Sequence, residues 1–136
     1  MKCIFCDIVN RLSPAEFLLE TEDVFAFLDI NPMNFGHALV IPRQHYADLK
    51  ELPPELVPEM FQTAQRVAVA VTDSLKADGF NVVVNNGRAA GQSVYHCHIH
   101  IIPRYFSDEF KFRLNLKQYQ HDELSKYGSI IRNSLA

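Results

Sequence analysis

The sequence predicts one α+β domain, in which an antiparallel sheet of about five strands carries one long helix. Short runs rich in β-branched and aromatic residues recur along the chain, as strands require. Only one stretch between these runs has the spacing of a long helix, so the regular alternation typical of a parallel sheet is absent. A length of 136 residues, 48% of them hydrophobic, is sufficient for one domain with its own core.

The runs with the composition of strands are residues 17–20, 24–29, 38–41, 81–84 and 94–102. Short terminal helices are expected at residues 3–10 and 122–135, with Asp122 as the N-cap of the second. Because only one link between strands is long and helical, we expect an antiparallel meander with the helices packed to one side.

The one long helix is expected between residues 56 and 77. Pro53, Pro54 and Pro58 crowd its start, where a missing N–H is tolerated, and Gly79 stands where helices commonly end. Its apolar positions cover more of the helix circumference than a core-facing stripe needs, which predicts a homodimer interface. These positions are Leu56, Val57, Met60, Phe61, Ala64, Val67, Ala68, Val71 and Leu75.

Composition excludes several classes of protein. No apolar run approaches the length of a membrane span, and the N-terminus lacks the apolar stretch of a signal peptide. Three cysteines fit a secreted disulfide framework poorly, so a cytoplasmic protein with reduced thiols is expected. The net charge of −3 argues against a nucleic acid polymer as partner, and an anionic substrate would need local donors.

Three histidines alternate with apolar residues at His96, His98 and His100. On a strand this spacing turns all three imidazoles to one face and turns Cys97 and Ile99 to the core. A single histidine in such a place usually lies on the solvent-exposed side of a strand, but three in strict alternation need another explanation. Neutral imidazole can act as a metal ligand, a general acid–base group or a nucleophile. Its attack on phosphorus would give a labile phosphoramidate that water can hydrolyse.

The loop before these histidines favours phosphorus chemistry. Its glycines allow the backbone N–H groups to approach an anion closely, and Asn85, Gln92 and Ser93 add side-chain donors. A glycine-rich loop alone is a weak signal, because many hairpins contain one. Its position directly before the three histidines makes it informative.

Four segments carry a resemblance to a known family: Phe27-Leu28-Asp29-Ile30-Asn31-Pro32, Gly36-His37-Ala38-Leu39-Val40-Ile41-Pro42, Gly91-Gln92-Ser93-Val94-Tyr95 and His96-Cys97-His98-Ile99-His100-Ile101-Ile102. Together these segments resemble the histidine-triad (HIT) family from about residue 4 to residue 104. The resemblance implies one HIT domain over residues 1–136, with its core at 4–104 and a C-terminal extension at 105–136. It further implies that the protein is a nucleotidyl hydrolase or transferase, and that it acts as a homodimer whose sheet is continuous across both copies.

The same resemblance implies roles for individual residues. His98 matches the nucleophile that forms the covalent nucleotidyl intermediate, and His100 matches the histidine on the scissile phosphate. His37 matches a histidine behind the triad, and Asp29 matches the carboxylate that binds the ribose hydroxyls. The remaining matches are Asn85, Gly91, Gln92 and Ser93 for the phosphate and leaving group, with Ser93 also catalytic, and Ile4, Phe5, Ile8, Phe27 and Ile30 for the base.

Cys3 and Cys6 form a C-x2-C pair, whose spacing lets two thiolates share one metal. From the residues alone the pair could also be a redox couple or two ordinary buried thiols. Bacterial members of the family resemble this sequence here, which implies a zinc held by Cys3, Cys6, His45 and His96. Four protein ligands leave no open position, so such a zinc would be structural, and no catalytic cofactor is expected.

The expected function is hydrolysis of a purine nucleotide conjugate at its α-phosphate, with release of the nucleoside monophosphate. Gln92 and Ser93 before the triad favour nucleoside phosphoramidates as substrates. The alternatives are hydrolysis of diadenosine polyphosphates and a non-catalytic nucleotide-binding regulatory protein. The extension after Arg104 departs from the phosphoramidase branch, and it leaves the physiological leaving group open.

Overall fold

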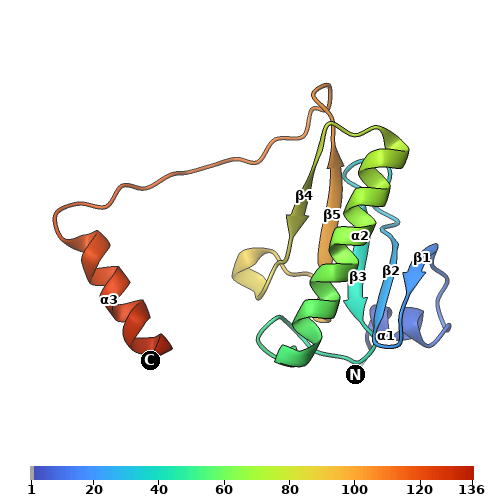
Figure 1. Cartoon of the computed structure of the whole chain (residues 1–136), viewed down its shortest axis with the longest axis horizontal. Coiled ribbons are helices and arrows are strands. Elements are labelled where there is room, and N and C mark those ends of the chain that lie inside the picture. Colours follow the sequence, from blue (N-terminus) through green and yellow to red (C-terminus); the bar gives the residue numbers. More distant parts are fainter. Residues whose placement is uncertain (1) are drawn as a thin grey trace.

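A computed structural model describes residues 2–136 as an α+β fold built on a five-stranded antiparallel sheet (Figure 1). The strand order is β1-β2-β3-β5-β4, and the predicted fold class is confirmed. The strands are β1 (Phe17–Glu20), β2 (Val24–Leu28), β3 (Ala38–Pro42), β4 (Gly79–Val83) and β5 (Ile99–Arg104). The helices are α1 (Ile4–Val9), α2 (Val57–Leu75) and α3 (Glu123–Leu135), with short 3-10 turns η1 (Pro54–Leu56) and η2 (Arg88–Ala90).

The sheet is not the meander that the sequence suggested. The long helix α2 connects β3 to β4, and β5 returns between these two strands and pairs with both. A link as long as α2 can cross over the sheet and leave room for one more strand, so consecutive strands need not be neighbours. Strand β5 is therefore an interior strand, and β4 lies at one edge of the sheet.

The predicted strand at 94–102 begins later, at Ile99. Ahead of it the backbone N–H of Cys97 donates to the carbonyl of Tyr46 at 2.6 Å instead of joining a strand ladder. The alternation of side chains nevertheless holds, because Cys97 and Ile99 lie in the core under α2. The triad thus spans the end of a loop and the start of a strand.

Helices cover both faces of the sheet, whereas the sequence pattern predicted helices on one face only. Strands β2 and β3 are apolar at nearly every position, so both of their faces need a cover. The first face packs on α2 through Val24, Ala26, Ala38, Val40, Ile99 and Ile101. The second packs on Phe5, Ile8 and Val9 of α1 through Phe25, Phe27, Leu39 and Ile41.

Helix α2 ends at Leu75, earlier than expected. Lys76 caps it in the left-handed conformation, with φ 53°, and Gly79 is the first residue of β4. Its buried stripe includes Met60, Ala64, Ala68 and Val71, so the apolar surplus is smaller than the sequence predicted. Of the expected apolar positions, Phe61 and Leu75 stay 41% and 43% exposed, and Val69, which was not among them, is 53% exposed.

The last part of the chain leaves the sheet as a C-terminal arm, defined here as residues 105–136. It runs out as an extended segment and ends in α3, which stands apart from the sheet and matches the helix predicted at 122–135 (Figure 1). Among residues 2–136, none of the helices combines the length and apolarity needed to cross a bilayer.

Gly36 is the glycine on which the packing depends most. Its φ is +95°, and a Cβ at this position would collide with Cδ1 of Leu75. Gly36→Ala should therefore lower the free energy of unfolding by roughly 1–3 kcal/mol, read as a lower melting temperature. Gly79→Ala is the matched control, since a Cβ there meets nothing within 4 Å. Equal melting temperatures of the two variants would contradict this account of the turn.

Candidate functional site

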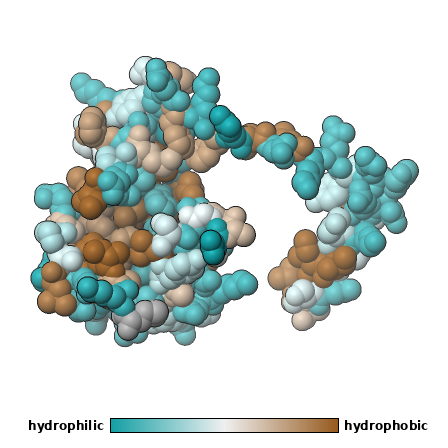
Figure 2. Space-filling view, turned by 180° about the vertical axis from the view of Figure 1, so that it is seen from behind, coloured by the Kyte–Doolittle hydropathy of each residue, from teal (hydrophilic) through white to brown (hydrophobic). Residues whose placement is uncertain are grey.

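A pocket of about 560 Å³ opens on the face of the sheet opposite α2, the face seen in Figure 2. Its walls come from α1 and the segment after it, from β2, β3 and the segment after β2, and from the loop before β5, and one end is polar. A space of this size is typical of sites for small ligands. The lining residues predicted from the sequence are Ile4, Phe5, Ile8, Phe27, Asp29, Ile30, Ser93, His98 and His100.

His98 lies at the polar end of this pocket with only 5% of its surface exposed. Its Nδ1 is 2.7 Å from the carbonyl oxygen of His96, an acceptor, so Nδ1 carries the proton. Burial lowers the pKa of His98 and favours the neutral ring. A neutral imidazole with a protonated Nδ1 has its lone pair on Nε2. The ring edge of Phe5, with centroids 5.1 Å apart, packs against this imidazole and holds its orientation.

His100 and His37 form a second histidine pair beside the first. The Met33 N–H donates to Nδ1 of His37 at 3.1 Å, so a neutral His37 carries its proton on Nε2. That N–H donates to Nδ1 of His100 at 2.9 Å. A neutral His100 therefore carries its proton on Nε2. One backbone amide fixes both tautomers.

The neutral state of these rings follows from burial. Desolvation by burial, together with the neighbouring His98 and His37 and against an opposing effect of Asp29, lowers the pKa of His100 to about 4. The pKa of His37 is also lowered by burial, and Asp29, whose Oδ2 lies 3.7 Å from His37 Nε2, partly offsets this. At neutral pH the pocket thus presents one free nitrogen lone pair and one N–H donor.

The loop residues assigned to phosphate binding are placed differently from one another. Ser93 lines the pocket, whereas Asn85, Gly91 and Gln92 do not. The Gln92 side chain is buried and fully engaged: its oxygen accepts from Gly87 N–H, and its nitrogen donates to the carbonyls of Ala47 and Val94. In this structure Gln92 holds the loop shape that presents Ser93.

Sequence reasoning missed several contributors to the pocket. Leu39 lines it and pairs with His100 across β3 and β5, but residues 38–41 are all apolar, so no alternation in the sequence marks the one that faces the pocket. Met33 and Pro42 act through backbone atoms, for which a sequence offers no signal. Further lining residues that were not predicted are Ser13, Pro14, Ala15, Leu28, Asn31 and Val94.

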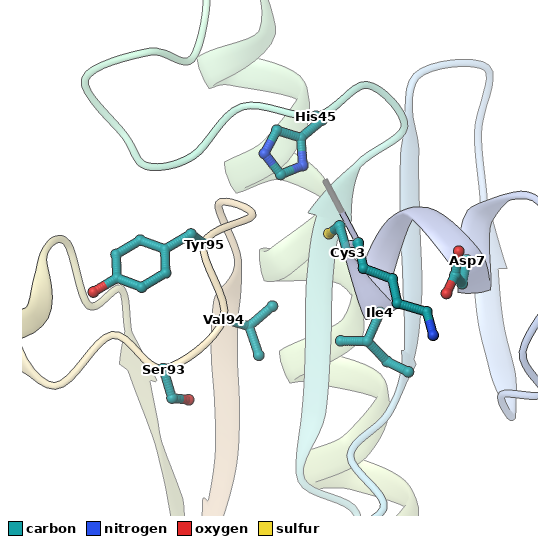
Figure 3. Close-up of a pocket in the computed structure, with 8 residues that line it drawn as sticks. Cys3, Ile4, Asp7, His45, Ser93, Val94 and Tyr95 are labelled. Carbon is teal, nitrogen blue, oxygen red and sulfur yellow. The ribbon is translucent and has the colours of Figure 1, made fainter.

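The four expected metal ligands meet at one point. One donor atom from each of Cys3, Cys6, His45 and His96 lies within 4.8 Å of the others. The Sγ of Cys6 is 3.4 Å from His45 Nδ1 and 3.5 Å from His96 Nδ1, and Cys3 Sγ is 3.5 Å from His96 Nδ1. Figure 3 shows Cys3 and His45 approaching each other across a neighbouring pocket, next to the loop that carries Ser93.

These distances fit a tetrahedral zinc ion. With Zn–S near 2.3 Å and Zn–N near 2.0–2.1 Å, tetrahedral geometry separates sulfur from nitrogen by about 3.6 Å. His96 would bind through Nδ1, because its Nε2–H donates to the carbonyl of Pro42 at 2.9 Å. Burial and the adjacent Cys3 raise the pKa of Cys6 to about 11, a cost that a bound cation would offset.

His96 joins the two clusters. Its ring faces the cysteines and His45, while its backbone carbonyl accepts the proton of His98 Nδ1. Movement of His96 would therefore move the acceptor that sets the tautomer of His98.

Comparison with known proteins gives a family match. The family profile described as "HIT domain" matches residues 10–107 of this chain. The chain is 39% identical over 134 residues to adenosine 5'-monophosphoramidase HNT1 of Saccharomyces cerevisiae, covering 98% of this chain and 81% of that protein. It is 44% identical over 102 residues to adenylylsulfatase HINT3 of Arabidopsis thaliana, covering 75% of this chain and 52% of that longer protein.

Solved structures extend the match to the whole chain. A HIT family member from Bacillus subtilis is 39% identical, with a TM-score of 0.94 over 100% of this chain and 99% of its own. A zinc-bound histidine triad family protein from Mycobacterium smegmatis is also 39% identical, with a TM-score of 0.78 over the same shares of each chain.

Cys6→Ser should remove most of the bound zinc, because Sγ of Cys6 approaches two of the other three ligands. The melting temperature should fall as well, since a metal at this cluster would close a long loop between α1 and the triad. Elemental analysis of protein purified without chelator or an affinity tag measures the metal. Cys97→Ala changes a thiol that lies in the core under α2, so this variant should keep its zinc. A wild-type zinc content near zero would leave Cys3 and Cys6 as ordinary thiols.

Acid should destabilise the fold through His100. Its pKa is about 4 in the folded protein, below the ordinary value of 6.5, so the unfolded chain binds more protons between these values. The stabilisation is complete above pH 6.5 and is lost as the pH falls towards 4. His100→Gln should flatten the decline of melting temperature between pH 7 and pH 5, whereas His121→Gln, at an exposed position, should not. An unchanged slope in His100→Gln would refute the assignment.

Proposed function

The chain belongs to the HIT domain family, and we propose that it is a nucleotidyl hydrolase that cleaves nucleoside phosphoramidates and releases the nucleoside monophosphate. The observation that carries the proposal is the free Nε2 of His98, aimed at the polar end of the pocket with a neutral donor, His100, beside it. A purely structural role would not explain this arrangement, because buried neutral imidazoles add little to the stability of a fold.

The pocket suits a purine nucleoside. Apolar side chains from α1 and β2, among them Phe5, Ile8 and Phe27, offer an apolar and partly aromatic surface for a base. Asp29 lines the same pocket, with its Oδ2 3.7 Å from His37 Nε2, and a carboxylate accepts two hydrogen bonds from a ribose diol. A nucleotide bound in this direction would place its α-phosphate near His98 and His100.

The first step is attack by Nε2 of His98 on the α-phosphorus. A P–N bond to His98 forms, and the bond from phosphorus to the leaving nitrogen breaks with its electron pair going to the amine. The amine takes a proton from a donor in the pocket, for which the Ser93 hydroxyl is available and can be resupplied by water. The His96 carbonyl stabilises the positive charge that His98 gains, and His100 Nε2–H donates to a phosphate oxygen.

The second step is hydrolysis of the nucleotidyl-histidine. Water attacks phosphorus, the P–N bond breaks, and His98 departs as a neutral imidazole that still has its Nδ1 proton. The water leaves one proton to solvent and its oxygen to the monophosphate. The enzyme returns to its starting protonation state.

A zinc ion held by Cys3, Cys6, His45 and His96 would supply rigidity rather than chemistry, because its four ligands leave no open position. The zinc-bound Mycobacterium smegmatis relative supports this choice of metal. The chain's own part is to hold α1, which carries one wall of the pocket, close to the triad.

A homodimer is part of the proposal. Strand β4 lies at an edge of the sheet with Phe80 and Val82 45% and 44% exposed, and α2 beside it exposes Phe61 and Val69. Unpaired edges and uncovered apolar faces invite association. Pairing of two copies along β4 would continue the sheet from one protomer into the other.

A substrate panel tests the activity. Adenosine and guanosine phosphoramidates, adenosine phosphosulfate and diadenosine polyphosphates should be compared by kcat/KM, since the two curated relatives carry the names of a monophosphoramidase and an adenylylsulfatase. Phosphoramidates should be the fastest. Faster turnover of a diadenosine polyphosphate would instead indicate a polyphosphate hydrolase. If no substrate were turned over, the protein would be a non-catalytic nucleotide-binding protein.

His98→Asn should abolish the chemical step and keep nucleotide binding, because the amide cannot attack phosphorus but leaves the pocket walls in place. A loss of roughly 10⁴-fold in kcat, about 5.4 kcal/mol in the barrier, is expected. Calorimetric titration with the nucleoside monophosphate checks that binding remains. His121→Asn changes a histidine on the arm and should keep its activity. If His98→Asn stayed within tenfold of the wild type, another nucleophile would be at work.

A further inference from the structure

The loop between β2 and β3 supplies the Met33 amide that fixes the tautomers of His37 and His100, yet little packing holds this loop. None of its residues 30–36 is buried. The apolar side chains of Ile30, Met33 and Phe35 are 86%, 45% and 88% exposed. A segment with so few buried contacts opens at little cost in free energy. The position of the Met33 N–H therefore has to be set by something other than a hydrophobic core.

Asn34 is the anchor of this loop. Within residues 2–136, its side chain is the one in the 30–36 segment that hydrogen-bonds to the rest of the chain. The amide Nδ2 donates to the carbonyl of Pro103 at 2.8 Å and to Oδ2 of Asp108 at 3.1 Å. The loop and the segment after β5 lie at the same end of the sheet (Figure 1). Because both hydrogens of one amide are used, Asn34 fastens the loop to the end of β5 and to the segment that follows it.

The carboxylate that accepts from Asn34 is itself fixed. Arg104 donates to both oxygens of Asp108 at 2.9 and 3.0 Å, and the Tyr105 N–H donates to the same carboxylate at 2.9 Å. Arg104 also donates to Asn81 of β4 at 2.7 Å. These contacts, the Arg104 hydrogen bonds first, hold the pKa of Asp108 well below its ordinary value, so the acceptor stays ionised. The point to which the loop is tied thus belongs to the β4–β5 side of the sheet.

The main chain joins Asn34 to His37. The His37 N–H donates to the Asn34 carbonyl at 3.0 Å and closes a four-residue turn. Gly36 is the third residue of this turn, and its φ of +95° is the left-handed conformation that a type II turn requires there. Met33 directly precedes the turn, and its N–H meets Nδ1 of His37 at 3.1 Å. Holding Asn34 in place therefore holds the Met33 amide against the His37 ring.

We propose that Asn34 is a positioning residue of the site, which keeps the Met33 amide on His37. Through that amide it keeps the N–H of His100 on the pocket side. Without the amide, His37 is free to carry its proton on Nδ1, and its Nε2 then accepts from Nδ1–H of His100. The Nε2 of His100 would in that case present a lone pair to the pocket. Asp29 Oδ2, 3.7 Å from His37 Nε2, still favours the first tautomer, so the loss of Asn34 should give a mixture.

The consequence for catalysis rests on the proposed function, in which the Nε2–H of His100 donates to a phosphate oxygen. A lone pair in its place repels that oxygen, so molecules with the second tautomer lack a donor that the reaction needs. Nucleotide binding depends on other groups. The walls for the base come from α1 and β2, and the Asp29 N–H is held at the end of β2 by the His37 carbonyl at 2.9 Å. Loss of Asn34 should therefore lower kcat and leave KM near that of the wild type.

Nitrogen-15 NMR of the full chain tests the positioning without any turnover. Asn34→Ala removes both N–H donors, and it should change the imidazole shifts of His37 and His100 from those of one tautomer to the average of two. Asn81→Ala is the matched control, because it takes a partner from Arg104 in the same network but leaves the loop untouched. This control should keep the wild-type tautomers. Wild-type tautomers in Asn34→Ala, or equal changes in both variants, would overturn the proposal.

Steady-state kinetics with an adenosine phosphoramidate adds a second readout. Asn34→Ala should lower kcat about two- to fivefold, because one lost hydrogen bond shifts a tautomer ratio by about fivefold. Asn81→Ala should keep the wild-type kcat. Equal kcat values for the two variants, or a loss that appears in KM alone, would contradict a positioning role for Asn34. If the wild type hydrolysed none of the substrates, the proposed function would fail, while the NMR comparison would still decide whether Asn34 sets the tautomers.

Discussion

The hydrogen bond from His98 Nδ1–H to the carbonyl of His96 is the interaction on which the proposed chemistry depends. It leaves the lone pair of His98 on Nε2, facing the pocket, and it keeps an acceptor beside the ring when positive charge develops there. The carbonyl is held in place because the ring of His96 is fixed twice, by the Pro42 carbonyl and by the cluster of Cys3, Cys6 and His45. A metal at that cluster would thus act on catalysis through position alone.

A second chain of hydrogen bonds gives His100 the opposite role to that of His98. Met33 N–H fixes His37, and His37 fixes His100, so that His100 offers a proton where His98 offers a lone pair. Burial supports both roles, because it keeps the imidazoles neutral and the pKa of His100 near 4. Two adjacent histidines are differentiated by what the backbone presents to the far side of each ring.

The sequence was sufficient for the features that depend on local periodicity. Alternation at His96, His98 and His100 predicted the shared face, and helical spacing predicted α2 and α3. It failed where nonlocal pairing decides: β5 inserts between β3 and β4, and α1 covers the face opposite α2. The four metal ligands converge although 93 residues separate Cys3 from His96, and only the family resemblance indicated that set. The roles of the Met33 N–H and the Pro42 carbonyl leave no signature in side-chain identity. Every residue except proline has a backbone N–H, and every residue has a backbone carbonyl.

The tautomer of His98 in the resting protein tests the central claim most directly. Nitrogen-15 NMR of the imidazole at neutral pH distinguishes a protonated ring nitrogen from one that carries a lone pair. The account predicts a neutral ring with its proton on Nδ1 and a free Nε2. This tautomer should already be present in the protein without bound nucleoside monophosphate. A proton on Nε2 would contradict it, because that nitrogen could not then attack phosphorus, and the His96 carbonyl would have lost the function assigned to it.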